Sequence, residues 1–269
     1  MRSYLHVLSM SDFRRLWTGA TVSTLGDGMT FVALSWLVLA EPGGTARLGL
    51  LGVCYTAPVL LGGLAVGPLL DRFDKRTVLI ADSLVRAAAV VSIPLTAALH
   101  AMPDWLPFAV AATYGLLKMV PLAGFPAAIP QLVDKSNLDA ANALESLSFS
   151  IANVVGPAAA GLLISQIGAA NVLLIDGASF LFFALATAMV RRELRPNTVL
   201  ASGSDTGTAL PRSASLTGLA KDRVIVATTI AFMAFNIAEG MLIVAAPWVA
   251  KNQDREVKDP PGLSRRSGL

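Results

Sequence analysis

The sequence predicts an all-α integral membrane protein, and its composition is the first reason. Of its 269 residues, 54% are hydrophobic and only 14% are charged, and the mean hydropathy is +0.63. Soluble domains carry about 25% charged residues, which form a polar shell around the core. A chain with so few charges needs lipid in place of that shell.

Apolar runs long enough to cross a bilayer are the second reason. A spanning helix needs about 20 predominantly apolar residues. The segments that meet this requirement are 16–40, 48–70, 78–99, 106–129, 143–165, 171–190 and 224–249. The first is too long, and too closely followed by others, to be a cleaved signal sequence.

The distribution of Lys and Arg predicts the orientation, because positively charged loops stay in the cytoplasm. With a cytoplasmic N-terminus, only Arg47 lies in an external loop. The cytoplasmic segments then hold Arg2, Arg14, Arg15, Arg72, Lys75, Arg76, Lys135, Arg191, Arg192, Arg195, Arg212, Lys221 and Arg223. We therefore expect a multi-pass protein of the cell membrane with a cytoplasmic N-terminus. The basic tail after residue 250 breaks this pattern, so either the seventh span inserts poorly or the tail is not a natural loop.

Patterns typical of catalysis or metal binding are sparse. The single cysteine, Cys54, lies within an apolar run, and His6 and His100 lie at opposite ends of the first hundred residues. The phosphate-binding pattern GxxxxGK[ST] does not occur, and there is no basic patch with interleaved aromatic residues. We therefore expect no enzyme, no metal or cofactor, and no nucleic-acid partner.

The chain is expected to divide into four parts. Residues 1–190 hold the first six spans as one bundle, and residues 191–223 are typical of a flexible cytoplasmic linker. Residues 224–250 hold the first helix of an incomplete second bundle, and residues 251–269 form a polar tail. A complete seven-helix protein such as a receptor is the alternative, but receptors usually place their N-terminus outside the cell.

A charged loop between the second and third spans carries the most specific motif, GPLLDRFDKR at residues 67–76. Here the chain resembles the major facilitator superfamily, whose loop pattern is G-x-x-x-D-R-x-G-R-[RK]. The matching residues are Gly67, Asp71, Arg72, Lys75 and Arg76. Asp74 stands where the family usually has glycine, so a tight turn with positive φ would be strained at this residue. The resemblance implies that this loop is a conformational latch, which holds two bundles together in the outward-facing state.

Residues 121–165 carry a second resemblance, to the fourth and fifth helices of the branch that includes macrolide-efflux proteins and the enterobactin exporter. Gly156, Pro157 and Gly161 are similar to the glycine–proline element of the fifth helix in proton-coupled antiporters. Small residues let membrane helices pack closely, and proline removes a backbone hydrogen bond. Simple helix packing is therefore the alternative interpretation of this motif.

Together these resemblances imply the six-helix N-terminal bundle of a major facilitator fold plus a seventh helix, apparently truncated. They imply a secondary active transporter, which exports a small drug-like or amphipathic molecule in exchange for protons by alternating access. The implied partners are the lipid bilayer, the small-molecule substrate and protons, with self-association or a partner half as a further possibility. An inactive remnant and an uptake permease remain alternatives.

Ionisable residues deep in the spans are the candidate substrate and proton sites, because a charge in the bilayer core is costly unless it is paired or hydrated. Asp27 and Lys118 lie at similar depth in the first and fourth spans. We hypothesise that both face the central cavity, with Asp27 as a proton or cation site and Lys118 as its counter-charge or as an anion-recognition group. A purely structural ion pair is the alternative. Asp176 and Glu239 are further candidates for a proton path.

A second pair of charges has a simpler interpretation. Asp82 and Arg86 lie four residues apart in the third span. Residues with this spacing are neighbours on one face of a helix. We therefore expect an ion pair within a single helix.

Overall fold

The computed structural model describes residues 2–196 and, farther along, only the isolated helical positions 223, 226, 227, 230, 231, 234 and 238. The chain divides into two units, residues 1–204 and 205–269, and the elements discussed below belong to the first. In the described part, six helices are long and apolar enough to cross a membrane.

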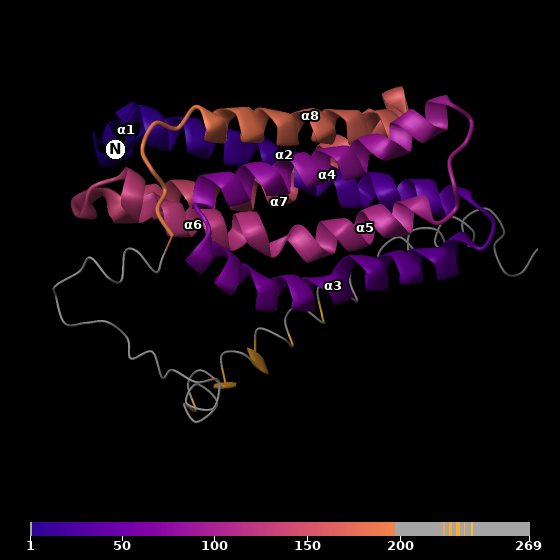
Figure 1. The fold of residues 1–269 in the computed structure, drawn as a ribbon. Coiled ribbons are helices and arrows are strands. Elements are labelled where there is room, and N and C mark those ends of the chain that lie inside the picture. Colours follow the sequence, from indigo (N-terminus) through magenta and orange to yellow (C-terminus); the bar gives the residue numbers. More distant parts are fainter. Residues whose placement is uncertain are drawn as a thin grey trace, which may run out of the picture. The chain divides into compact units, whose positions relative to one another are not determined.

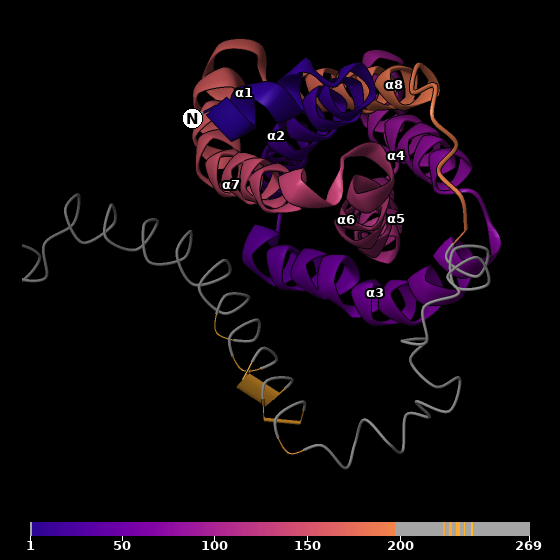
Figure 2. The same ribbon diagram turned by 90° about the vertical axis from the view of Figure 1, so that its left-hand side faces the viewer.

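These six spans follow a short N-terminal helix, α1 (Arg2–Ser9). They are α2 (Ser11–Ala40), α3 (Gly44–Arg72), α4 (Lys75–Ala98), α5 with α6 (Leu106–Leu117 and Met119–Leu132), α7 (Leu138–Ile167) and α8 (Ala169–Ala188). A 3₁₀ helix, η1 (Lys135–Asn137), precedes α7. The spans run lengthwise beside one another (Figure 1) and form a bundle in the end-on view (Figure 2). The all-α membrane fold and the first six predicted spans are confirmed, whereas the seventh, 224–249, lies outside the described residues apart from isolated positions.

Some helices begin earlier than their apolar runs. The helix predicted at 16–40 begins at Ser11 and includes Arg14 and Arg15 in its first turns. Long basic side chains can lie along a helix while their charged ends reach polar surroundings. Hydropathy therefore detects the lipid-exposed length of a span rather than the whole helix.

The fourth span is interrupted at Lys118, between α5 and α6. Pro121 explains the position of this break. Proline has no backbone N–H, so it leaves the carbonyl of the residue four positions earlier, Leu117, without its helical hydrogen bond. Leu117 is the last residue of α5.

Two apolar cores fill the bundle, one toward each end. One includes Leu16, Leu79 and Ile129, and the other includes Leu34, Ile93 and Phe180. Along α2, Asp27 falls between Leu16 and Leu34, so the charged residues occupy a layer between the two cores. Such a layer is expected only where the polar groups satisfy one another.

The spans differ greatly in how far their own bundle covers them. In their most apolar stretches, 50% of α4 and 56% of α8 is buried, against 11% of α3 and 22% of α7. Figure 2 shows α3 on the opposite side of the bundle from α8. Large apolar side chains on these poorly covered helices, such as Leu64 and Val154, are more than two-thirds exposed (73% and 71%). An apolar outer surface of this kind needs either lipid or another membrane bundle to cover it.

Candidate functional site

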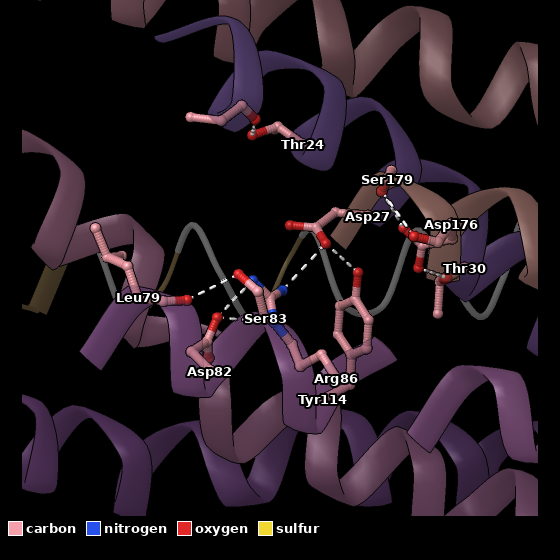
Figure 3. A network of polar contacts seen from close by, with 11 residues as sticks. Thr24, Asp27, Thr30, Leu79, Asp82, Ser83, Arg86, Tyr114, Asp176 and Ser179 are labelled. Carbon is pink, nitrogen blue, oxygen red and sulfur yellow. Dashed lines mark hydrogen bonds and ion pairs between the residues drawn. The ribbon is translucent and has the colours of Figure 1, made fainter. Parts of the chain in front are cut away.

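Arg86, on α4, is the centre of a cluster of charged side chains in the middle of the bundle (Figure 3). Its Nε and Nη2 both donate to Oδ2 of Asp82, over 3.1 and 2.9 Å, and its Nη1 donates to Oδ1 of Asp27 on α2 over 3.1 Å. The side chain of Arg86 is 1% exposed. The expected ion pair within α4 is therefore present, but the same guanidinium also pairs with a second helix. Two carboxylates explain how a cation is tolerated at this depth.

Asp27 is the member of the cluster that can be reached from outside. Its side chain is 27% exposed, against 1% for Asp82. Its Oδ1 also accepts a hydrogen bond from the Tyr114 hydroxyl on α5, whereas its Oδ2 accepts none from the residues that the structure describes. Asp27 thus joins three helices through one oxygen and leaves the other free to meet a proton or a ligand.

Aromatic rings surround the guanidinium of Arg86. Its Cζ lies 4.3 Å from the ring centroid of Phe180 and 5.3 Å from that of Tyr114. The ring of Tyr114 in turn stacks on Tyr55, with centroids 5.7 Å apart. A cation over an aromatic face is stabilised without a hydrogen bond. These rings therefore stabilise the charge of Arg86 in addition to its two carboxylate partners.

Asp176, on α8, is fully buried beside this cluster. It accepts hydrogen bonds from the hydroxyl of Thr30 on α2 and, over 3.0 Å, from Oγ of Ser179. Gly26 leaves the space that this carboxyl occupies, because a Cβ atom there would overlap both Asp176 and Ser179. Neither of these hydrogen-bond donors is a cation. Asp176 is thus a carboxyl held by hydroxyl groups, and its nearest charged neighbours act on it through space.

Lys118 lies apart from Asp27. It sits at the break between α5 and α6, is exposed, and places Nζ 5.4 Å from the ring centroid of Tyr55. The cation that pairs with Asp27 is Arg86. Lys118 is therefore not the residue that pairs with Asp27 in this structure, and its role as a counter-charge stays a prediction. Its role in anion recognition stays a prediction.

Sequence reasoning missed part of this site. Tyr114 and Thr30 were not singled out, and Arg86 was given only a structural role within α4. The signal that was available is depth, since Arg86 lies in the middle of a span and so needs partners on other helices. The further candidate Glu239 lies outside the described residues.

An apolar groove of about 340 Å³ lies between α2 and α8. Its lining is Val22, Leu25, Gly26, Met29, Ile175, Ala178, Ser179 and Phe182. Neither Asp27 nor Arg86 lines it, so we do not assign it to the charge cluster. In residues 2–196, no group of three or more His, Cys, Asp or Glu side chains is placed to hold a metal ion.

Residues 189–196, which follow α8, fold across one end of the bundle, and we call this segment the clasp. Arg15 Nη1 donates to the backbone oxygen of Met189 over 3.0 Å, and the backbone N–H of Arg192 donates to Asp12 Oδ2 over 3.0 Å. The guanidinium of Arg192 also donates to two backbone carbonyls at the end of α6. The first residues assigned to the linker by sequence are thus held on the bundle.

Two residues of the predicted latch loop bind at or beside the clasp. The backbone N–H of Lys75 donates to the carbonyl of Leu194 over 3.1 Å, and its Nζ donates to that of Arg195. Arg76 Nη2 donates to the carbonyl of Ala188, at the end of α8. Lys75 is fully buried. These two cations are therefore engaged within their own bundle, and a latch to another bundle stays a prediction.

The other residues of the motif lie at its surface. Gly67, Asp71 and Arg72 are exposed, and in the described part nothing lies within 4 Å of a Cβ placed on Gly67. Asp74 is the N-cap of α4 and accepts hydrogen bonds from two backbone N–H groups of its first turn, over 2.8 and 3.2 Å. Its φ is −61°, so the strain expected from replacing glycine is absent.

The glycine–proline motif of α7 is divided between two environments. A Cβ on Gly156 would lie 2.9 Å from the carbonyl of Leu25 and 3.0 Å from Cα of Gly28, so α7 packs closely on α2 at this point. Pro157 lies beside Gly28 as well. Gly161 is exposed, and a Cβ added to it would meet no described atom within 4 Å. Close packing within the bundle thus explains Gly156 but not Gly161.

A bundle of six membrane-length helices around interacting charges is compatible with a membrane transporter. Residues 3–255 match the family described as transmembrane secretion effector, and the chain belongs to this family of the major facilitator superfamily. The family predicted from the loop at 67–76 is therefore confirmed. The chain is a multi-pass membrane protein of a transporter family.

Relatives with curated names agree with this assignment. The chain is 27% identical to the multidrug efflux pump Tap of Mycolicibacterium fortuitum over 65% of its own length and 44% of that protein. It is 25% identical to macrolide efflux protein A of Streptococcus pyogenes, over 66% and 44%. It is 29% identical to the staphyloferrin A transporter of Staphylococcus aureus, over 52% and 36%. The chain thus spans less than half the length of these relatives. No solved structure matches it significantly.

Proposed function

We propose that the chain is part of a secondary active transporter that exports a small amphipathic molecule in exchange for protons. The observation that carries this proposal is the geometry of Asp27, a partly exposed carboxylate whose inner oxygen is fixed by Arg86 and Tyr114. A carboxylate at this depth is costly while charged, and binding a proton removes that cost. Asp27 is therefore the proposed site of proton uptake.

The charges around Asp27 favour a cationic substrate. Arg86 is the one guanidinium that contacts the described carboxylates of the cluster, which are Asp27 and Asp82. The pair of carboxylates exceeds the positive charge by one, so the site attracts either a proton or a cation. Competition of the two for Asp27 would couple them in exchange. Asp176, and Glu239 beyond the described residues, are proposed as further members of the proton path.

Lys118 supports a second substrate class. It is an exposed cation over the ring of Tyr55, and such a group suits the carboxylates of a siderophore. The names of the relatives include both macrolide efflux and staphyloferrin A transport. The two substrate classes therefore need to be tested together.

Alternating access requires two bundles that move against each other around a central site. The described residues form one bundle, and the poorly covered helices α3 and α7 offer surfaces for another. We propose that a second bundle completes the site, with the N-terminus and the loop at 67–76 in the cytoplasm.

The exposed Arg72 allows this orientation to be tested with Arg72→Cys in a Cys54→Ser background, since a membrane-impermeant thiol reagent should label it only in inverted vesicles.

The test of function is transport into inverted vesicles from bacteria that express the full chain and lack their own drug exporters. The vesicles are energised, a pH-sensitive dye reports proton release, and the panel contains a macrolide, other cationic drugs and a carboxylate siderophore. We expect cationic drugs to release protons from the vesicles. Asp27→Asn should abolish this release, whereas the exposed Asp134→Asn should leave it unchanged.

Each result has a defined meaning. Proton release with cationic drugs that disappears in Asp27→Asn supports exchange at this carboxylate. Release by the siderophore alone, with loss in Lys118→Gln, would replace the cationic substrate class with an anionic one. Well-inserted protein without proton release for any compound would contradict the proposal for this chain.

A further inference from the structure

The guanidinium of Arg86 is shared unequally between its two carboxylates. Nε and Nη2 converge on a single oxygen of Asp82, Oδ2, while Nη1 reaches Asp27. An arginine and a carboxylate usually bind as two parallel hydrogen bonds to two different oxygens. In this structure two donors share one oxygen of Asp82, and the third donor contacts Asp27.

The second oxygen of Asp82 is left without a partner. Oδ1 makes no hydrogen bond in the described part of the chain. Water does not reach it easily either, because the side chain of Asp82 is only 1% exposed. Buried polar atoms are nearly always paired, so an unpaired oxygen next to a guanidinium with movable donors calls for an explanation. A guanidinium donor that turned from Asp27 to Oδ1 of Asp82 would supply the missing bond.

We propose that Arg86 is a two-position counter-ion. While Asp27 is ionised, Arg86 bridges Asp27 and Asp82, as observed. When Asp27 takes up one proton from water on the open side of the bundle, Arg86 leaves it and closes a fork on both oxygens of Asp82. Arg86 keeps its own charge throughout, so Asp27 and its counter-ion separate without creating an unpaired buried cation. This inference rests on the proposed function in taking Asp27 as the group that binds the proton.

The surroundings of Arg86 allow this movement. From α8, the ring of Phe180 lies over its Cζ at 4.3 Å, and a ring face imposes no particular direction on the donors. From α5, Tyr114 contacts it through its ring and donates its hydroxyl to Asp27, which it can still hold after protonation. Asp176 of α8 acts on Arg86 through space in the observed position.

Charges from the remaining helices do not compete with Asp82 for Arg86. From α3, Tyr55 is an uncharged phenol that stacks on Tyr114. Lys118, at the end of α5, lies over the outer side of Tyr55 and repels rather than attracts a guanidinium. Asp82 is therefore the destination that the geometry offers when Asp27 loses its charge.

The proposal makes Arg86 and Asp82 positioning residues rather than residues that touch substrate. A rigid, purely structural triad would show the same contacts at every pH. The two cases differ in whether the hydrogen bonds of Arg86 change when Asp27 is protonated, so the experiment must observe the guanidinium itself.

The experiment uses the purified full chain in lipid nanodiscs, with nitrogen-15-labelled arginine, and follows the side-chain N–H signals by NMR over a pH series. Arg86→Lys identifies the signals of Arg86. We expect these signals to move between two limiting positions in the wild type. Asp27→Asn, which mimics the protonated acid, should hold them at the acid limit at every pH. Asp82→Asn, which lacks the second carboxylate, should never reach that limit, and the exposed Asp134→Asn should behave as the wild type.

Either variant suffices if the other does not fold, and Asp27→Glu should retain the pH response. Signals of Arg86 that stay fixed over the pH series, or that respond to pH in Asp27→Asn as in the wild type, would overturn the proposal. No substrate takes part in this measurement. Proton-coupled transport with a motionless Arg86 would therefore contradict this inference alone, whereas a moving Arg86 without transport would contradict only the proposed function.

Discussion

The bundle buries basic side chains in two regions and binds them through different partners. In the middle, Arg86 is paired with the carboxylates of Asp27 and Asp82. At the end that carries the clasp, Lys75 is equally buried, but its Nζ binds a backbone carbonyl. A carboxylate can lose its charge by taking a proton, and a carbonyl cannot. The partners of Arg86 can therefore change charge with pH, whereas the hydrogen-bond partner of Lys75 Nζ cannot.

The largest effect is expected from removing the central cation. Arg86→Gln leaves the buried Asp82 and the partly exposed Asp27 without a counter-charge, and breaking a buried pair costs about 3–5 kcal/mol. We expect a large loss of thermal stability in detergent, measured as the temperature at which the monodisperse protein disappears from size-exclusion chromatography. The matched control is Arg191→Gln, an exposed arginine. Equal melting of the two variants would show that the central ion pairs are not needed for folding.

A smaller loss is expected from filling the space beside Asp176. A Cβ from Gly26→Ala would overlap the Asp176 carboxyl and the Ser179 hydroxyl, and overpacking of this kind costs about 1–3 kcal/mol. Gly161→Ala is the control, because its position is open, and alanine is favoured over glycine in a helix by about 1 kcal/mol. The melting temperature should fall in Gly26→Ala and rise in Gly161→Ala. A neutral Gly26→Ala would mean that α2 and α8 can separate at this point without cost.

The comparison between the two regions is tested most directly at Lys75. If this lysine serves only to donate to a carbonyl, Lys75→Gln should retain more stability than Lys75→Met, which we expect to cost about 1–2 kcal/mol. The rate of trypsin cleavage after Arg191 and Arg192 measures how far the clasp detaches from the bundle. Lys135→Met, at an exposed residue, should cleave like the wild type. Faster cleavage of Lys75→Gln than of Lys75→Met would show that apolar packing at this position matters more than the hydrogen bond.

The smallest effect is expected at the helix cap. Asp74→Ala removes two hydrogen bonds to the first turn of α4 and should lower stability by about 1 kcal/mol, whereas Asp74→Asn should retain most of it. Asp134, which precedes η1, makes no side-chain cap hydrogen bond, so Asp134→Ala is the control. Thermal melting of the four proteins checks this order. A stable Asp74→Ala would show that the clasp alone holds the start of α4.

The fold was largely predictable because each span is encoded locally. About 20 apolar residues in a row need no distant partner to insert into lipid as a helix. The break at Lys118 was also encoded nearby, by Pro121, but the run around it is apolar and was predicted as one continuous span. The clasp was not predicted, because its polar residues resemble a linker until their contacts with α2, α4 and α6 are known.

The site was predictable only in part. Depth in the spans selected Asp27 and Asp176, but pairing was assigned by equal depth, and that rule chose Lys118 in place of Arg86. Depth tells how far along the membrane normal a residue lies. It does not tell which neighbouring helix its side chain faces. Arg86 was accounted for within α4 by Asp82, so its second partner was not sought.

The amino-acid sequence by itself determined the membrane-spanning helices and, through the loop at 67–76, the family, because both depend on residues close together in the chain. Only the tertiary structure decided which charges meet. The rotation of α4 against α2 and α5 brings Arg86 to Asp27 and Tyr114, residues 59 and 28 positions away from it. Such contacts depend on how helices pack, and in a bilayer that packing is set by close steric fit between helices rather than by local sequence.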